Sequence, residues 1–508
     1  MSGIFKNTHF MKPSFTKGFK CSLDSIGRNF MRLRRYLELF ILLMSFQSAS
    51  LFGNQPGNIC NVRDFGAKGD GQTDDTYAIQ QAIDACSMSG GGQILLPPGR
   101  YLSGTIRLKS HIVIHLDAGA TLLGSKDLER YSGFTKSDIV PCLVVDRWYR
   151  GLLVGEDAED VTIEGPGTID GHCVYDPNGE EKMRGPHTIL FGRCRDFSIR
   201  DLHIKEAGNY AILFQSSDRV EIKRVKISGG WDGVHFRGTP ENWCHDVNII
   251  DCQFYTGDDC IAGNYIERAV INNCILNTGC NGIRLIGPAK GLFVNNCLIY
   301  GPGVNPHRTT GRYTMEEGIC LQPSAWSPCP GPLEDVLLSN LTIHNVRNPF
   351  HIVIKKGNSA NNIRVERITA SRIYGMASSV ESWAEKPISN VVFRDVTIEY
   401  EGCYKLDKSS KSVDVPGLSA RPLPVWGFYA HRVDHLEFDN VRLRCLQNDP
   451  RPAFQIEHIV ELDLDSFNFR RHENAPEPFI LTDVELVRLR QSDIKTREIR
   501  NSKTVVWK

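Results

Sequence analysis

The chain has 508 residues, in which 59 lysines and arginines balance 59 aspartates and glutamates. This balance gives no support for a nucleic-acid partner or for binding to an acidic membrane, so attraction to any acidic ligand must be local. A chain of this length is expected to form about three domains unless one structural unit repeats along it.

A basic and then apolar stretch near the N-terminus has the order of an export signal. Residues 31–35 read MRLRR, residues 36–46 are largely apolar, and the small residues Ser48, Ala49 and Ser50 follow. The apolar run is shorter than the roughly 20 residues that span a bilayer, and a single N-terminal anchor is the alternative. We therefore predict that residues 1–52 are an N-terminal extension with a signal peptide. The protein is then exported to the periplasm, the cell surface or the medium, with no stable membrane partner.

Both ends of the remaining chain are expected to differ from its middle. Asp74 and Asp75 can cap a helix whose apolar face would consist of Ala78, Ile79, Ala82, Ile83 and Cys86. Residues 58–125 are therefore expected to cover the N-terminal end of a repeated domain. The charged residues 495–503 show no repeat and are expected to form a solvated cap or a loose end.

From about residue 158 to residue 494 the chain restarts one short pattern, for example EDVTIEGPGTI, RDFSIRDLHI, HDVNIIDCQF and DHLEFDNVRL. Apolar and polar residues alternate within each copy, and the middle copies begin about 22 to 27 residues apart. A strand unit of this length cannot bury its own apolar face, so the copies must stack. Propeller blades need about 40 residues, and the spacing of leucine-rich repeats is absent. The sequence predicts an all-β fold, a single-stranded right-handed parallel β-helix over residues 58–500 with a short N-terminal helical cap.

Three cysteines recur about one coil apart in similar contexts. Cys252, Cys274 and Cys297 lie in IIDCQF, INNCIL and VNNCLI. A free cysteine behaves as a small buried apolar residue, so we expect a stacked internal ladder rather than disulfides or a metal site.

Three aspartates stand in two segments of the middle coils. Asp232 lies in GWDGVH at 230–235, and Asp258 and Asp259 lie in TGDDCIA at 256–262. Stacked strands are about 4.8 Å apart, so matching positions on adjacent coils become neighbours. A turn or bulge at Gly257 would let both adjacent aspartates serve one cleft. The alternative is an ordinary solvated turn, which is the commoner role of an Asp-Asp pair.

The TGDDCIA segment, the preceding Asp-Gly pair, GPGTIDG at 165–171 and FGAKGDGQTDD at 65–75 together resemble glycoside hydrolase family 28, the polygalacturonase family. The similarity covers about residues 58–485. It implies hydrolysis of a pectin-related or other acidic polysaccharide or oligosaccharide, without a cofactor or a metal. It also implies that Asp258 is the general acid and that Asp232 and Asp259 activate the water. Inverting hydrolysis needs such a division between a protonated carboxyl group and a carboxylate.

The chain departs from the family at three motifs. GWD at 230–232 stands in place of Asn-Thr-Asp, GCNG at 279–282 in place of Gly-His-Gly, and VIK at 353–355 in place of Arg-Ile-Lys. The aspartate and the lysine remain, whereas the histidine and the arginine that support the carboxylates and the substrate are missing. We predict a changed substrate, with unsubstituted polygalacturonate cleaved poorly. The candidate substrate-binding residues are Lys355, His235, Arg237, Arg284, Trp231 and Asn281.

An ordinary structural role is the alternative for several of these candidates. A lone tryptophan is more often part of a core, and a lone histidine is more often a hydrogen-bonded structural residue. Between Pro302 and Pro323 the repeat is interrupted by a loop that contains His307, Arg308 and Arg312, which forms either a wall of the cleft or an idle insertion.

Two further functions fit the same fold. A polysaccharide lyase or epimerase would need a base and neutralisation of the uronate charge, often by calcium, and Lys355 is the one evident basic candidate. A non-catalytic glycan-binding β-helix would explain the missing histidine and arginine but not the retention of three aspartates.

Overall fold

A computed structural model of the protein describes residues 58–136, 149–402, 413–470, 479–491 and 502–507. The expected signal peptide and extension at residues 1–52 lie outside these residues. Within the described part of the chain, no helix is long and apolar enough to cross a membrane.

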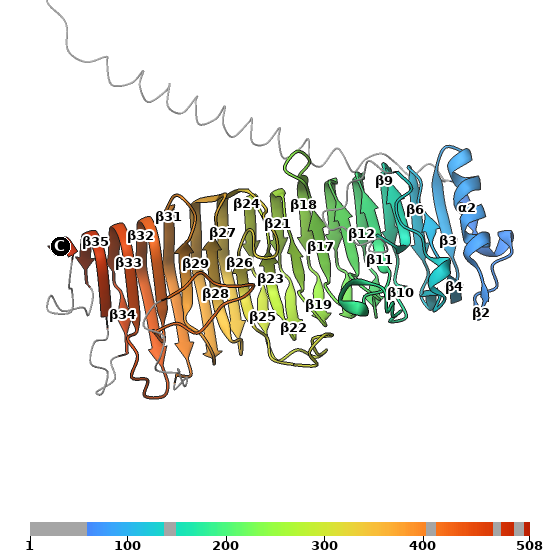
Figure 1. Cartoon of the computed structure of the whole chain (residues 1–508). Helices are drawn as coiled ribbons and strands as arrows, with labels where there is room; N and C mark the ends of the chain where they lie inside the picture. Colours follow the sequence, from blue (N-terminus) through green and yellow to red (C-terminus); the bar gives the residue numbers. More distant parts are fainter. Residues whose placement is uncertain (1–57, 137–148, 403–412, 471–478, 492–501, 508) are drawn as a thin grey trace, which may run out of the picture. The chain divides into compact units, whose positions relative to one another are not determined.

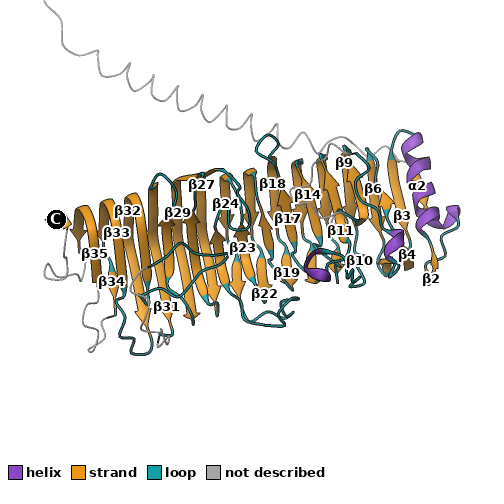
Figure 2. Cartoon of the chain, in the orientation of Figure 1, coloured by secondary structure: helices purple, strands orange, loops and turns teal. Residues whose placement is uncertain are grey.

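The unit that begins at Asn58 is a right-handed parallel β-helix, as the repeat predicts. The chain winds in coils, and corresponding strands of successive coils pair in parallel into three long sheets (Figure 1). Loops join the strands at the corners of each coil (Figure 2).

The first sheet holds the alternating segments of the repeat. In pairing order its strands are β1 (Ile59–Asn61), β3 (Gly92–Leu96), β6 (Ile112–Leu116), β9 (Glu159–Glu164), β12 (Arg195–Arg200), β15 (Asp218–Lys223), β18 (Cys244–Ile250), β21 (Ile266–Asn272), β24 (Ala289–Asn295), β27 (Gly331–His344), β29 (Asn358–Ile373), β31 (Ile388–Tyr400), β32 (Phe428–Cys445), β33 (Phe454–Asp465), β35 (Phe479–Arg490) and β36 (Ser502–Trp507).

The second sheet consists of short strands. They are β2 (Asp70–Asp74), β4 (Gly99–Ser103), β7 (Ala120–Gly124), β10 (Thr168–Asp170), β13 (His203–Lys205), β16 (Lys226–Gly229), β19 (Gln253–Thr256), β22 (Ile275–Thr278) and β25 (Leu298–Tyr300), and the far half of β27 continues them. Further along, β34 (Asn468–Phe469) pairs with β32.

The third sheet follows the second around each coil. Its strands are β5 (Ile106–Arg107), β8 (Gly151–Glu156), β11 (His187–Gly192), β14 (Ile212–Gln215), β17 (Val234–Arg237), β20 (Ile261–Gly263), β23 (Asn281–Leu285), β26 (Glu317–Leu321), β28 (Asn348–Ile354) and β30 (Ser378–Ser382), and the first part of β32 continues them.

The predicted helical cap is present as α2 (Thr76–Met88), which packs against β1 and β3. The five residues expected on its apolar face are its buried residues. Asp74 accepts from the backbone N–H of Thr76 at 3.1 Å, as a capping side chain does. Asp75 occupies the cap position, but its carboxylate binds the backbone N–H groups of Lys68 and Gly69 instead. The short 3-10 helices are η1 (Val62–Phe65), η2 (Leu128–Arg130) and η3 (Glu180–Lys182).

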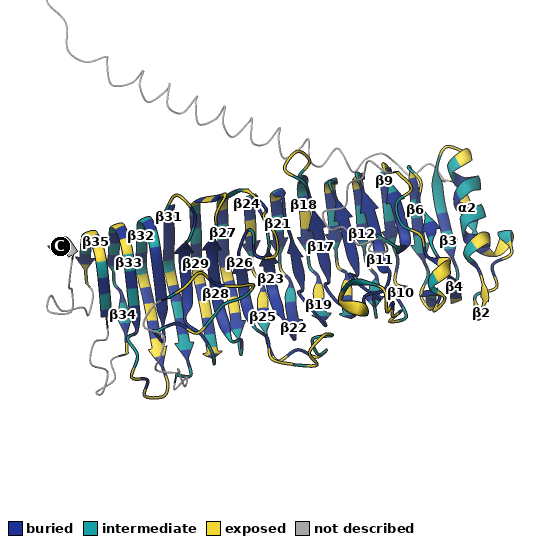
Figure 3. Ribbon diagram, viewed as in Figure 1, coloured by how far each residue is buried: buried dark blue, intermediate teal, exposed yellow. Residues whose placement is uncertain are grey.

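The core is one continuous apolar column inside the coils, visible as the buried strands of Figure 3. Alternation along each strand produces it: in β12, for example, Phe197 and Ile199 are buried while their neighbours are not. Cys252, Cys274 and Cys297 are buried free thiols whose S–H groups donate to backbone carbonyls of their own turns at 3.2–3.3 Å. The predicted packing ladder of cysteines is therefore confirmed.

The C-terminal expectation was partly wrong. Residues 492–501 lie outside the described chain, but Ser502–Trp507 forms β36 and pairs with β35. The short segment SKTVVW lacks the repeat signature and still extends the sheet, because an exposed strand edge pairs through backbone groups whatever the side chains.

Candidate active site

The three aspartates lie at the same corner of adjacent coils, where the second sheet passes into the third. Asp232 follows β16, and Asp258 and Asp259 follow β19. Backbone hydrogen bonds join the two turns, from Asp258 to the carbonyl of Trp231 at 3.2 Å and from Gly233 to the carbonyl of Asp259 at 3.0 Å. Stacking of the coils thus brings the aspartates together.

Glycine makes this close approach of the two turns possible. Gly229 and Gly230 have φ values of +71° and +70°, a region that favours glycine. A Cβ atom on Gly257 would lie only 2.4 Å from the carbonyl oxygen of Gly230 on the preceding coil. The TGDD turn therefore needs a glycine for packing, whereas the φ of Gly257 is not in the region that favours glycine.

The three carboxyl groups are buried, with exposed fractions of 3% for Asp232, 8% for Asp258 and 7% for Asp259. Their closest oxygen atoms all lie within 4.8 Å of one another. They line a cavity of about 320 Å³ together with the arginines Arg184, Arg237 and Arg284. A buried carboxylate cluster facing a cavity is the arrangement expected of a catalytic site rather than of a solvated turn.

Asp232 and His235 form a buried pair. The His235 Nδ1 atom lies 2.6 Å from a carboxylate oxygen of Asp232, and the Tyr210 ring stacks on the imidazole with 4.3 Å between centroids. Burial, together with the charges of Asp258 and Asp259, raises the pKa of Asp232 well above its usual range. Burial and the neighbouring cations lower the pKa of His235 well below its usual range. The pair thus favours a neutral state.

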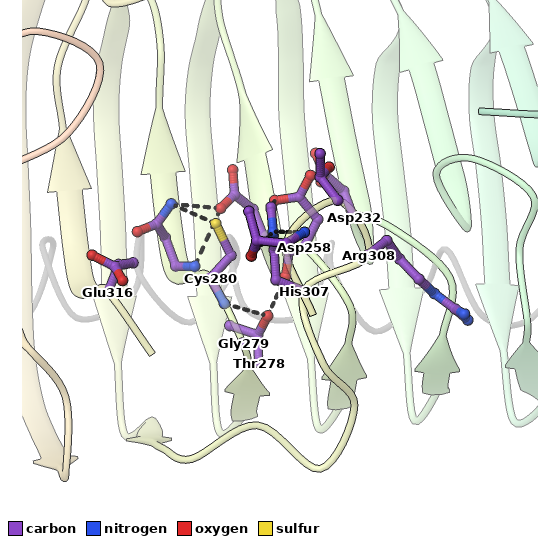
Figure 4. A network of polar contacts seen from close by, with 12 residues as sticks. Asp232, Asp258, Thr278, Gly279, Cys280, His307, Arg308 and Glu316 are labelled. Atoms are coloured by element: carbon purple, nitrogen blue, oxygen red, sulfur yellow. Dashed lines mark hydrogen bonds and ion pairs between the residues drawn. The ribbon is translucent and has the colours of Figure 1, made fainter. Parts of the chain in front are cut away.

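Asp258 has the opposite electrostatics. An Nη2–H of Arg184 binds one of its oxygens at 3.1 Å. His307 Nε2 lies 3.6 Å from the other oxygen, and Figure 4 shows His307 beside Asp258. Burial raises the pKa of Asp258, but the contacts with His307 and Arg184 outweigh it and hold that pKa below its usual range. These contacts therefore favour the ionised form of Asp258.

Asp259 lies between these two extremes. Its carboxylate accepts from the side-chain amide of Asn281 at 2.7 Å and from the Asn281 backbone at 3.2 Å. Burial and the charge of Asp258 raise the pKa of Asp259 to about 6, although Arg284 and Asn281 act in the other direction. The expected carboxyl group with a raised pKa thus exists, but it is Asp232 or Asp259 rather than Asp258.

The other predicted residues divide into two groups. Arg237, Arg284 and His235 line the cavity, and Asn281 lies behind it against Asp259. Trp231 does not line the cavity: it packs beside Tyr210, and the Arg184 guanidinium lies 4.0 Å from its ring centroid. Lys355 also lies away from it, where its Nζ donates to the carbonyl of Gly417 at 2.7 Å.

The interrupting loop packs against the aspartate turns, although none of residues 302–323 lines the cavity itself. Besides the contact of His307 with Asp258, Arg308 donates to the carbonyl of Gly230 at 3.0 Å. Arg312 donates to the carbonyl of Gly279 at 3.1 Å and to Cys280 Sγ at 3.3 Å. The loop thus places His307 beside Cys280. Cys280 belongs to the GCNG segment, which stands where the resemblance leads one to expect Gly-His-Gly.

Sequence reasoning missed Arg184 and its acidic neighbours Glu180 and Glu181, which also line the cavity. Their one signal was the interruption of the repeat between β10 and β11, which resembles that at residues 302–323. Two sets of side chains converge enough to offer three ligand atoms to a cation: Asp258, Cys280 and His307, and the three aspartates themselves. The expectation of a metal-free site stays a prediction.

Two family models match parts of the chain. Residues 59–142 match "Rhamnogalacturonase A/epimerase, pectate lyase-like", and residues 187–327 match "Right handed beta helix region". A polygalacturonase of Malus domestica is 25% identical over 325 residues, which cover 58% of this chain and 62% of the relative. A polygalacturonase of Gossypium barbadense is 25% identical over 400 residues, 72% and 89% of the two chains. The match thus spans less than two thirds of the Malus protein.

Two solved structures are similar to this chain, and the first of them shares its fold. PfbA, a surface adhesin of Streptococcus pneumoniae, is 15% identical with a TM-score of 0.50, covering 85% of this chain and 93% of its own. A family 28 exopolygalacturonase of Yersinia enterocolitica is 16% identical with a TM-score of 0.49, covering 89% and 78%. The relatives agree with the resemblance found in the sequence: this chain is similar to polygalacturonases at 25% identity over part or most of its length.

Proposed function

We propose that the protein is a glycoside hydrolase that cleaves a pectin-related or other acidic polysaccharide or oligosaccharide, with Asp232, Asp258 and Asp259 as catalytic carboxylates. The observation that carries this proposal is the set of three buried carboxyl groups with opposed pKa directions, lining one cavity on adjacent coils. Glycoside hydrolysis needs one carboxyl group protonated and another ionised at the same pH.

The resemblance assigns the acid to Asp258, whose contacts favour its ionised form. We propose that the proton held by Asp232 or Asp259 moves to Asp258 when the substrate enters, through one intervening water, which a spacing of at most 4.8 Å accommodates. Asp258 then donates this proton to the oxygen of the leaving sugar. Asp232 and Asp259 remain as carboxylates, and they take a proton from the attacking water. The number of protons in the cluster is unchanged at the end of one turnover.

The arginines around the cavity favour an acidic sugar. Arg184, Arg237 and Arg284 are each at most 8% exposed, and all three line the cavity. Guanidinium groups match carboxylate geometry and bind it through paired N–H donors. Since none of these arginines belongs to the family's Arg-Ile-Lys motif, we propose a substrate other than unsubstituted polygalacturonate.

We propose inversion at the anomeric carbon from the resemblance rather than from the carboxylate spacing. Inverting enzymes have carboxyl groups about 6.5–9.5 Å apart and retaining enzymes about 5–5.5 Å, whereas the closest oxygens here lie within 4.8 Å. Proton NMR of the first products settles the stereochemistry, and retention would contradict a water attack opposite the acid.

A lyase or epimerase is the second candidate, favoured by one observation. Burial favours the neutral form of His235, and its Nε2 atom is buried beside the cavity without a hydrogen-bond partner in the structure. In the tautomer that is protonated at Nδ1, this Nε2 could accept a proton from a sugar carbon. The deciding experiment offers purified protein polygalacturonate and a panel of acidic and neutral glycans, with Asp258→Asn as the control. We expect hydrolysis to produce new reducing ends without forming unsaturated sugars, which would be detected by their ultraviolet absorbance. An unsaturated product indicates the lyase, and binding without cleavage of any glycan indicates a binding protein.

A further inference from the structure

A loop crosses the third sheet immediately beyond the aspartates. Residues 413–425, hereafter the strap, connect β31 to β32, and Figure 1 draws this part of the chain in orange across the strands of the middle coils. The strap reaches β23 through the carbonyl of Leu418, which accepts from Arg284 Nη2 at 2.7 Å. The Gly417 carbonyl accepts from Lys355 at 2.7 Å and from Gln322 at 2.9 Å. The strap thus covers three successive coils on the C-terminal side of the site.

Two sets of contacts fix the strap. The Arg421 guanidinium donates to both carboxylate oxygens of Glu381, at 2.8 and 2.7 Å, and Glu381 is fully buried. The backbone N–H of Ala420 donates to Glu317 at 2.6 Å. Apolar residues of the strap pack on the sheet beside Tyr429: Val413, Leu423 and Val425. A buried, bidentate ion pair with apolar anchors is expected to hold the strap in one position.

The strap occupies cations that would otherwise be available to a sugar carboxylate. Arg284 and Lys355 were both expected to bind substrate, yet each donates to a backbone carbonyl of the strap. A polysaccharide lying along the sheet past the aspartates would have to displace these carbonyls and the Glu381–Arg421 pair. The sheet on that side is therefore closed to a continuous chain.

No residue of the strap lines the cavity itself, which is bounded by other segments of the chain. Glu180, Glu181 and Arg184, which precede β11, close the end toward the N-terminal coils, and Glu181 accepts from Thr309 of the interrupting loop at 2.6 Å. The segments Thr239–Pro240 and Trp326–Pro330 also line the cavity. Its volume of about 320 Å³ lies at the low end of the about 300–1,000 Å³ typical of pockets for small molecules. The site is thus a pocket rather than an open groove.

We infer that the strap restricts the protein to the end of an acidic glycan chain, so that it releases short terminal units and does not cut internal bonds. This inference rests on the proposed hydrolase and specifies its mode of action. The terminal sugar enters the pocket with its carboxylate among the arginines, and the rest of the chain leaves through the mouth of the pocket instead of continuing along the sheet.

The test compares the intact protein with a variant whose strap residues 414–420 are replaced by a short Gly-Ser linker. On whichever acidic polysaccharide the glycan panel identifies, the intact protein should release one short product from the first minutes, with almost no fall in viscosity. The shortened variant should give mixed product lengths and a severalfold larger fall in viscosity for the same number of new reducing ends. Val415→Ser, at an exposed strap side chain, is the matched control and should behave as the intact protein.

A binding measurement separates this inference from the proposed function. In the Asp258→Asn background, affinity for oligosaccharides of increasing length, prepared from the acidic polysaccharide that the glycan panel identifies, should stop rising after a few sugars when the strap is intact. It should continue to rise when the strap is shortened. Circular dichroism and thermal unfolding establish that the shortened variant is folded. Internal cleavage by the intact protein overturns the inference and leaves the hydrolase standing. Failure to bind or cleave any glycan overturns both.

Discussion

Stacked aspartates occur at two places on the coils, and these differ in what surrounds the carboxylates. One place is the irregular start of the first-sheet strands, hereafter the outer corner, and the other is the corner before the third sheet that holds the candidate site. On the outer face, Asp196 pairs with Arg219 of the next coil at 2.5 Å, and Asp246 pairs with Arg268 at 2.7 Å. Side-chain hydrogen bonds from these arginines lower the pKa of Asp196 and of Asp246. All four side chains are 44–53% exposed.

At the other corner the same stacking gathers three aspartates out of water, where Arg184 pairs with Asp258 at 3.1 Å and His235 lies 2.6 Å from Asp232. Burial raises the pKa of Asp232 and of Asp259 there, whereas arginine partners lower the pKa of the outer aspartates. The coil geometry brings aspartates into register at both corners, so register alone does not make a catalytic site. The candidate catalytic aspartates differ from the outer, structural ones in two respects: they are buried, and they are not each matched by a cation.

The largest expected difference between the corners is in catalysis. Asp258→Asn should reduce turnover about 10²- to 10⁴-fold, because it removes the proposed acid at nearly constant side-chain size. Asp246→Asn, at the outer corner, should retain turnover within a few-fold. Initial rates on the glycan identified by the panel provide the measurement, with circular dichroism to show that both variants fold. Turnover of Asp258→Asn near that of the unmodified protein would remove Asp258 from the mechanism.

The next effect is on the pH dependence of turnover. His307→Gln removes a contact that lowers the pKa of Asp258, so that pKa should rise. If Asp258 must be protonated to act as the acid, the basic limb of the kcat profile should move to higher pH, with kcat reduced about tenfold or less.

The matched control for His307 is His245→Gln, since His245 pairs with Asp218 at 2.8 Å on the outer face. It should leave the profile in place. A fall in kcat for His307→Gln with no movement of either limb would assign His307 a purely structural part in the loop.

Stability should change in opposite directions at the two corners. The pKa of Asp259 is raised from 3.8 to about 6 by burial and by Asp258, so folding disfavours its charged form. The resulting loss of stability is absent below about pH 4, grows as the pH rises from 4 to 6, and is constant above. Asp259→Asn should therefore raise the free energy of unfolding at pH 7 by about 1–2 kcal/mol and hardly at all at pH 4.

Chemical denaturation of Asp259→Asn at the two pH values tests this sign. Destabilisation at pH 7 would show that the hydrogen bonds from Asn281 outweigh the cost of burying the charge. Activity should be lost in either case, since the variant has no carboxylate at position 259.

The sequence predicted the fold because the signal repeats. Alternation within strands and recurrence about once a coil fix which side chains face inward, and equivalent residues such as Val247, Ala269 and Leu292 align on successive coils. The same recurrence placed Asp232 beside Asp258, because both follow a short strand of the second sheet and precede one of the third. What repeats is therefore accessible from sequence.

The segments that interrupt the repeat could not be placed from the sequence. Arg184 reaches Asp258 across 74 residues from an insertion with no periodicity, and that contact sets the charge of the acid. The strap binds Arg284 and Lys355 through backbone carbonyls, which every residue possesses, so no side-chain pattern indicates it. The residue types of Arg284 and Lys355 identify both as binding groups, but they do not identify the groups that these cations bind.

The smallest expected effect belongs to the outer pairs. Asp196→Asn breaks the ion pair with Arg219, and because both side chains are about half exposed, solvent and salt screen the interaction. We expect a loss of about 0.2–1 kcal/mol in the free energy of unfolding at pH 7. The pKa of Asp196 is lowered in the folded state, so this contribution is present above about pH 4 and fades as the pH falls through the folded pKa. It should also shrink in high salt, whereas the gain from Asp259→Asn, at a site closed to solvent, should not. Denaturation of both variants at low and high salt provides the comparison. An equal salt dependence would mean that the aspartate cavity is open to ions, and that burial does not distinguish the two corners.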